Sequence, residues 1–174
     1  MKILVYSFLL ITSLSFGQRV KTELVVGETS KQELLESKNK TWFQDIYDAY
    51  IPNEDDLEQI TKLLKKQKKN QFEIYFGTWC PDSRREVPRI YKLLDLAGYD
   101  TEKVKLVGVK TDKKIPNISD EEREKLDVQR VPTLLIFDKK GVEINRYVEY
   151  AQTTLEKDIL MILSGENYKH SYLD

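Results

Sequence analysis

The second half of the chain alternates apolar runs of strand length with helical patterns, and this order restricts the fold to one class. The expected elements are a strand (72–77), a helix (83–97), a strand (104–110), a helix (about 120–126), two strands (133–138 and 142–148) and a helix (153–163). The continuous apolar runs at 104–109 and 133–137 are typical of strands covered on both faces. Residues 138–141 form a turn long enough for a hairpin, so the last two strands should be antiparallel. The sequence therefore predicts an α/β fold, with a mixed sheet between helices on both faces.

The first seventeen residues have the pattern of a secretory signal peptide. Lys2 supplies the charged start, residues 3–14 are largely apolar, and Ser15-Phe16-Gly17 places small residues where a signal peptidase reads them. The apolar stretch is shorter than the roughly 20 residues that a membrane-spanning helix needs. We therefore expect cleavage after Gly17, a mature chain beginning at Gln18, and a protein exported to the periplasm or the extracellular space.

Composition excludes several classes of partner. About 157 residues follow the expected leader, which is enough for one domain with a proper core. The 28 basic and 29 acidic side chains nearly cancel, so no basic field indicates binding to nucleic acid or, after leader cleavage, to a membrane. The single histidine, His170, has no ligand companions at metal spacing and should be exposed in the tail. We expect neither a metal nor a cofactor.

Before the alternating region, the sequence predicts a helical extension over residues 18–52. Ser30 with Glu33, and Thr41 with Gln44, have capping-box spacing at the start of two helices. Asn53 is placed to cap the following helix. The expected organisation is therefore a signal peptide (1–17), this extension (18–52), the main domain (53–164) and a C-terminal tail (165–174).

The only cysteine, Cys80, lies between the first predicted strand and its helix. A thiolate is favoured at the positive end of a helix dipole, so this position favours a reactive thiol. Arg84 and Arg85 add positive charge there and Asp82 opposes them. The alternative is an inert thiol, because free cysteine is among the most buried residue types.

The main domain resembles the thioredoxin superfamily over residues 53–164. The motif Trp79-Cys80-Pro81-Asp82-Ser83 follows a strand as the family's Trp-Cys-x-x-Cys does. Pro88 lies inside the next helix, where the family has a proline. The segment Val131–Phe137, which begins Val131-Pro132, resembles the family's cis-proline segment, and Lys140-Gly141 matches its hairpin turn.

The resemblance implies roles for these residues. Cys80 would be the attacking thiol, and Ser83, in place of the second cysteine, would donate a hydrogen bond to its thiolate. Trp79, Pro81 and Asp82 would form part of the substrate-binding surface. Val131 and Pro132 would complete that surface: a cis bond between them would let the Val131 backbone pair with an extended substrate.

The departures from the family pattern restrict the chemistry. A serine at position 83 cannot release a mixed disulfide, because exchange needs a thiolate. The family's buried acid is Ile74 here, and the neighbouring Glu73 should face the opposite side of its strand. The connection between 110 and 132 is also longer and more charged. A one-cysteine peroxidase is a formal alternative, but the threonine and proline that peroxiredoxins place before their cysteine are absent.

Two functions therefore remain from the sequence. The first is a monothiol oxidoreductase or isomerase, in which Cys80 exchanges with disulfides or thiols of exported proteins and an external thiol, such as a small-molecule reductant, releases it. The second is a thioredoxin-fold module that binds extended peptide, without redox turnover.

Overall fold

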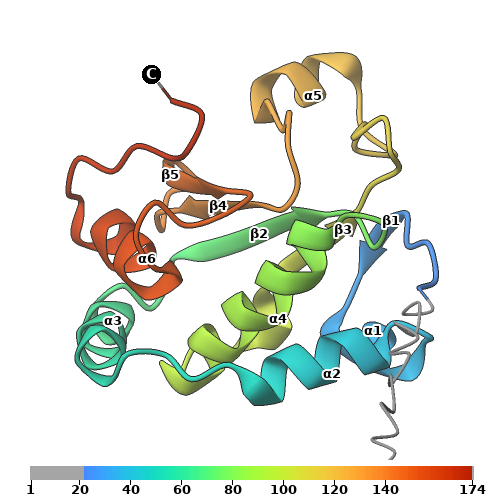
Figure 1. Ribbon diagram of the computed structural model, residues 1–174. Helices are drawn as coiled ribbons and strands as arrows, with labels where there is room; N and C mark the ends of the chain where they lie inside the picture. The colour runs from blue at the N-terminus through green and yellow to red at the C-terminus, as the bar shows by residue number, and fades with distance from the viewer. Residues whose placement is uncertain (1–21, 174) are drawn as a thin grey trace, which may run out of the picture.

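The computed structural model describes residues 22–173, and the predicted signal peptide lies outside them. A five-stranded sheet forms the centre of the molecule (Figure 1). Its strands are β1 (Gly27–Thr29), β2 (Gln71–Phe76), β3 (Lys105–Gly108), β4 (Thr133–Phe137) and β5 (Glu143–Val148). The helices are α1 (Lys31–Glu36), α2 (Lys40–Ala49), α3 (Glu54–Lys66), α4 (Pro81–Leu96), α5 (Asp120–Leu126) and α6 (Leu155–Ser164), with a 3-10 turn η1 (Thr101–Lys103).

The sheet is mixed, as predicted. The strand order is β1-β3-β2-β4-β5. Strands β2 and β3 are parallel, whereas β4 is antiparallel to both β2 and β5. Every element predicted from residue 71 onward is present within two residues of its expected ends. The predicted α/β class is therefore confirmed.

Strand β1 was not predicted from the sequence. It pairs antiparallel with β3 and adds a fifth strand from the part of the chain expected to be helical. The strand is only three residues long, and it begins at Gly27, whose φ of +96° is a conformation that other residues rarely adopt. Such a short segment carries no recognisable alternation, and its pairing with β3 defines it.

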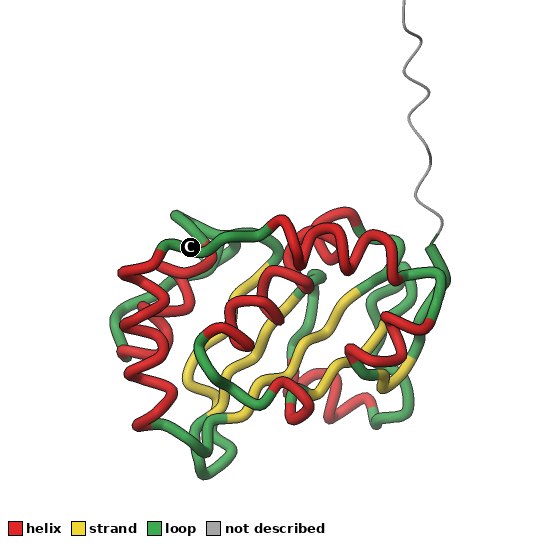
Figure 2. Tube along the Cα trace, turned by 90° about the horizontal axis from the view of Figure 1, so that it is seen from below, coloured by secondary structure: helices red, strands yellow, loops and turns green. Residues whose placement is uncertain are grey.

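The two faces of the sheet are covered unequally. Helices α1–α4 and α6 lie on one face and α5 on the other (Figure 1), and Figure 2 shows the helices packed across the strands. The larger core includes Phe72, Ile74 and Phe76 of β2 with apolar residues of those five helices. The smaller core, on the other face, contains Tyr75, Val107 and Leu135. Alternation along each strand separates the two cores.

Side-chain caps define several helix starts. Capping boxes begin α1 at Ser30 and α5 at Ser119, and Asn53 caps α3 by accepting a hydrogen bond from the Asp56 N–H (3.0 Å). The expected cap at Thr41 is wrong, because α2 begins at Lys40 and its N-cap position is Asn39, two residues before Thr41. The amide of Asn39 instead accepts hydrogen bonds from Glu23 N and Trp42 Nε1, and so ties α2 to the segment before β1.

The C-terminal tail returns to the domain after α6. Tyr168 is buried, and its hydroxyl donates to Asp158 Oδ2 (3.0 Å). Asn145 of β5 donates to the Tyr168 carbonyl (3.0 Å). The expectation that His170 is exposed is wrong: its ring is half-buried, and Nδ1 accepts from the Tyr172 N–H. Burial, followed by the charge of Arg146, lowers the pKa of His170. Within residues 22–173, no helix has the length and apolar character needed to cross a membrane.

Candidate functional site

Cys80 occupies the N-cap of α4. Strand β2 ends at Phe76, and the chain turns so that the Cys80 N–H donates to the Gly77 carbonyl (2.9 Å). The Cys80 carbonyl accepts the first helical hydrogen bond, from Arg84 N (3.1 Å). Pro81 follows at the first helical position, where a missing N–H leaves no helical hydrogen bond unmade. The thiol is thus held at the start of a sixteen-residue helix.

The sulfur faces the Val131–Pro132 segment. Cys80 Sγ donates a hydrogen bond to the Val131 carbonyl (3.2 Å), although 51 residues separate them. The peptide bond between Val131 and Pro132 is cis. The tertiary structure therefore brings together the two motifs that the resemblance linked.

Cys80 is nevertheless well covered. The residue is 7% exposed and packs in the smaller core with Val107, Val109 and Val131. Low exposure, and a carbonyl that accepts from the S–H group, favour an inert thiol, whereas the position at a helix start favours a thiolate. A small shift of the Val131 segment would separate the sulfur from its carbonyl partner.

Ser83 lies one turn further along α4 and is completely buried. Its Oγ accepts a hydrogen bond from the Gly77 N–H (3.1 Å). The hydroxyl therefore joins the turn after β2 to the first turn of α4. Gly77 N–H is thus the hydrogen-bond partner of Ser83 Oγ, in place of the Cys80 thiolate that the sequence predicts.

Trp79 forms part of the wall beside the thiol. Its Nε1 donates to the Val109 carbonyl (2.9 Å), which fixes the ring against the segment after β3. The ring also lies directly over Gly77: a Cβ on that glycine would be 2.6 Å from Trp79 ring atoms. The glycine thus allows the close packing of the tryptophan.

Helix α4 carries a buried carboxylate, Glu86, that is not predicted from the sequence. Glu86 is 3% exposed, and its Oε1 lies 2.5 Å from Arg85 Nε. The Tyr147 hydroxyl of β5 donates to Glu86 Oε2 (3.0 Å). Burial, then the charge and hydrogen bond of Glu86, raise the pKa of Tyr147. The sequence signal for its burial is that Glu86 stands beside apolar residues of α4 that face the core.

Asp82, expected on the substrate surface, is paired. Its carboxylate lies 2.8 Å from Arg85 Nη1, and both side chains are more than a third exposed. Arg85 thus bridges Asp82 at the rim and Glu86 in the interior. This pairing offsets the negative charge that Asp82 places near the thiol.

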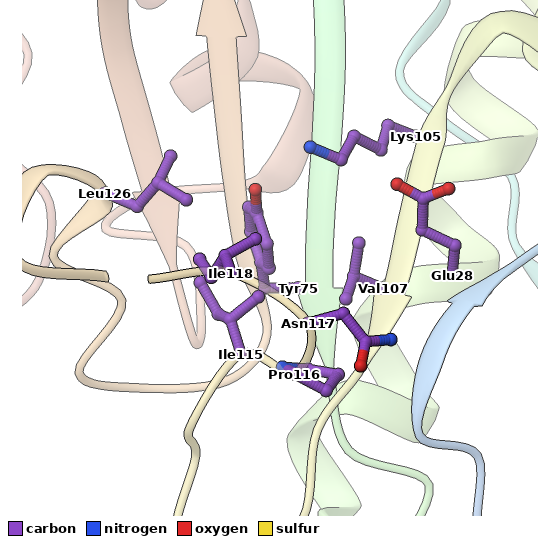
Figure 3. Close-up of a pocket in the computed structure, with 9 residues that line it drawn as sticks. All are labelled: Glu28, Tyr75, Lys105, Val107, Ile115, Pro116, Asn117, Ile118 and Leu126. Carbon is purple, nitrogen blue, oxygen red and sulfur yellow. The ribbon is translucent and has the colours of Figure 1, made fainter. Parts of the chain in front are cut away.

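A pocket lies on the thinly covered face of the sheet (Figure 3). It has a volume of about 330 Å³, a floor formed by Tyr75 and Val107, and a wall formed by residues 115–118. At its polar end, Glu73 accepts from the Tyr75 hydroxyl (2.6 Å) and lies 3.4 Å from Lys105 Nζ. Glu28 and Asn117 also line the pocket, so its walls are both polar and apolar.

Among the described residues there is no group of three or more histidine, cysteine, aspartate or glutamate side chains arranged to hold a metal ion.

The fold and the site define a class: a mixed-sheet α/β domain with a thiol at a helix start, opposite a proline-containing backbone segment. A family model described as thioredoxin matches residues 28–161, and the chain belongs to this family. The match confirms the resemblance and begins within β1. No curated protein matches the chain in sequence.

Several solved structures are similar to the chain. A protein of unknown function from Pseudomonas aeruginosa is 17% identical, covers 72% of this chain and 81% of its own, and has a TM-score of 0.47. Oxidised mitochondrial thioredoxin 3 from Saccharomyces cerevisiae is 23% identical, with coverages of 59% and 87% and a TM-score of 0.36. Fasciola hepatica thioredoxin is 23% identical, with coverages of 56% and 86% and a TM-score of 0.36.

Proposed function

We propose that this protein is an exported monothiol member of the thioredoxin family that carries out thiol–disulfide exchange through Cys80. The observation that supports this most is the 3.2 Å contact between Cys80 Sγ and the Val131 carbonyl. It places the thiol beside backbone that an extended substrate strand would pair with. Family membership supports thiol–disulfide chemistry as the general activity.

The exchange would proceed in two steps. The Cys80 thiolate attacks one sulfur of a substrate disulfide, so that a mixed disulfide forms as the substrate S–S bond breaks, and the leaving thiolate takes a proton from water. In reduction, two equivalents of a small thiol then release Cys80 and are themselves oxidised to a disulfide. In isomerisation, a second cysteine of the substrate releases Cys80 without net redox change. Ser83 cannot perform the release.

The substrates would be disulfide- or thiol-containing exported proteins, because the first seventeen residues have the pattern of a signal peptide. The chain recovered from the exported fraction should begin at Gln18 by intact-mass measurement. Exported protein that retains Met1 would contradict cleavage after Gly17.

The monothiol mechanism is tested by whether a mixed disulfide on Cys80 persists in the absence of an external thiol. Purified protein mixed with hydroxyethyl disulfide should gain one adduct on Cys80 and retain it until a small thiol is added. Ser83→Cys should form an internal disulfide and release the adduct unaided, because the two sulfurs then lie one helical turn apart. Cys80→Ala should gain no adduct. Insulin-disulfide reduction by wild type without added thiol would show that the mechanism is wrong.

The second candidate is a peptide-binding module in which Cys80 is dispensable, and the 7% exposure of Cys80 favours it. Two measurements discriminate between the candidates. Exported partners trapped on Cys80 as mixed disulfides favour exchange. Partners captured equally by Cys80→Ala, together with resistance of the wild-type thiol to small disulfides, favour the module.

A further inference from the structure

The C-terminal tail contacts a residue adjacent to the Val131–Pro132 segment. The ring of Tyr172 lies over the Arg130 guanidinium, with 3.6 Å from the guanidinium carbon to the ring centroid. Arg130 is the residue immediately before Val131, whose carbonyl accepts the Cys80 hydrogen bond. The tail therefore contacts the residue next to the thiol's partner.

Glu149 connects the tail to the same segment. Its backbone N–H donates to the Pro132 carbonyl (2.8 Å). Its carboxylate accepts a hydrogen bond from the Tyr172 hydroxyl and lies 3.5 Å from Arg130 Nη1. Glu149 also has a left-handed backbone (φ +59°), which is uncommon for a residue with a side chain. Contacts on both its backbone and its side chain hold it in that conformation.

The segment is held on several sides. Besides the Glu149 contact, Thr133 Oγ1 donates to the Arg130 carbonyl (2.8 Å). The tail itself is anchored upstream by Tyr168, and Ser171 Oγ donates to the Tyr150 carbonyl (3.1 Å). In Figure 1 the tail runs from α6 back past β5.

We propose that Arg130, Glu149 and Tyr172, which we call the tail clamp, are positioning residues that hold the Val131–Pro132 segment against Cys80 and so set the reactivity of the thiol. The biological meaning of this clamp rests on the proposed exchange function. The physical effect of the clamp is independent of that function, because the clamp controls only the access of reagents to the Cys80 sulfur. With the clamp intact, the Val131 carbonyl holds the thiol and covers it.

The experiment measures alkylation of Cys80 by iodoacetamide, a small neutral reagent, in the full mature chain. Tyr172→Ala should accelerate alkylation by about threefold or more, the size expected when a cation–π contact and a hydrogen bond to a carboxylate are lost. Tyr172→Phe keeps the ring over Arg130 and removes only the hydroxyl. Its alkylation rate should therefore lie between that of wild type and that of Tyr172→Ala. Tyr172→Phe also provides the test if Tyr172→Ala does not fold.

Tyr168→Phe is the matched control. It removes a tyrosine hydroxyl from the same tail, where it bonds to Asp158, but it leaves the clamp untouched. Unfolding free energies are measured on every variant. If Tyr168→Phe accelerates alkylation as much as the Tyr172 variants at equal loss of stability, the tail acts by general loosening and the clamp is wrong.

The outcomes also separate the clamp from the exchange function. A wild-type thiol that reacts, with Tyr172 variants that react no faster, overturns the clamp and leaves the exchange function standing. A wild-type thiol that resists alkylation, with a Tyr172→Ala thiol that reacts, supports the clamp and counts against exchange by the native protein. If neither thiol reacts, both proposals fail.

Discussion

At the scale of single residues, Gly77 and Trp79 explain how the turn before Cys80 is shaped. A glycine is needed at position 77 because the tryptophan ring occupies the space of a Cβ, and the Trp79 Nε1 bond to Val109 resists movement of the ring. Ser83 Oγ accepts from the N–H of the same glycine. Three positions around the thiol therefore depend on one another.

Gly77→Ala should destabilise the protein by about 1–3 kcal/mol, because the new methyl group must displace the Trp79 ring and break its hydrogen bond. Urea denaturation measures the loss, and tryptophan fluorescence reports the displacement. In a Trp79→Ala background the same glycine change should cost much less, because the obstructing ring is absent. Equal costs in the two backgrounds would show that the ring does not require the glycine.

At the scale of elements, Asp95 of α4 attaches the N-terminal helices to the domain. Its carboxylate accepts from Lys31 Nζ of α1, Tyr47 OH of α2 and Thr101 Oγ1 of η1, each at 2.6 Å. Burial alone would raise the pKa of Asp95, but the hydrogen bonds from Lys31, Thr101 and Tyr47 together lower it below its ordinary value of 3.8. The ionised form is therefore the one that the fold stabilises.

Asp95→Asn should lower the unfolding free energy by about 1–3 kcal/mol near neutral pH, since hydrogen bonds to a charged acceptor are weakened. The pKa of Asp95 is lower in the folded chain than in the unfolded chain. The stabilisation is therefore complete at pH values above the unfolded-state pKa, and it is lost as the pH falls through the folded-state pKa. The difference between wild type and variant should thus be constant from pH 7 to 5 and shrink below about pH 4.

Urea unfolding across this pH range is the measurement, with Tyr47→Phe as the control that removes one donor and keeps the carboxylate. A difference that grows toward acid pH would contradict the assigned sign.

At the scale of the whole molecule, residues before 53 complete both the sheet and the core. β1 forms one edge of the sheet. Leu34, Trp42 and Phe43 are at most 4% exposed, and the Phe43 ring meets Tyr91 of α4 edge-on with centroids 5.8 Å apart. Burial of each such side chain contributes about 1.5–3 kcal/mol. Their sum is comparable with the whole stability of a typical domain, about 5–15 kcal/mol.

A chain that begins at Asn53 should therefore fail to fold cooperatively, although the thioredoxin resemblance starts there. Thermal melting followed by near-ultraviolet circular dichroism should show no transition, whereas a chain beginning at Thr22 should melt as one unit. A cooperative transition in the shorter chain would show that the N-terminal elements are accessory.

Local sequence determined most of what was predicted correctly. The strands and helices after residue 71 were readable because apolar periodicity and the turn at 138–141 are properties of neighbouring residues, and the same holds for the upstream caps at Ser30 and Asn53. The position of Cys80 at a helix start was readable for the same reason. The resemblance of its motif to the thioredoxin pattern then pointed to the family.

Only the tertiary structure decided the features that depend on distant partners. Strand β1 forms because it pairs with the edge of β3, and its three residues are too few to show a strand pattern in the sequence. The burial of Cys80, the pairing of Ser83 Oγ with Gly77 and the contact of Tyr172 with Arg130 depend on where side chains come to rest after packing. Periodicity encodes which face of an element is apolar, whereas the partner that covers that face is selected only when the whole chain has folded.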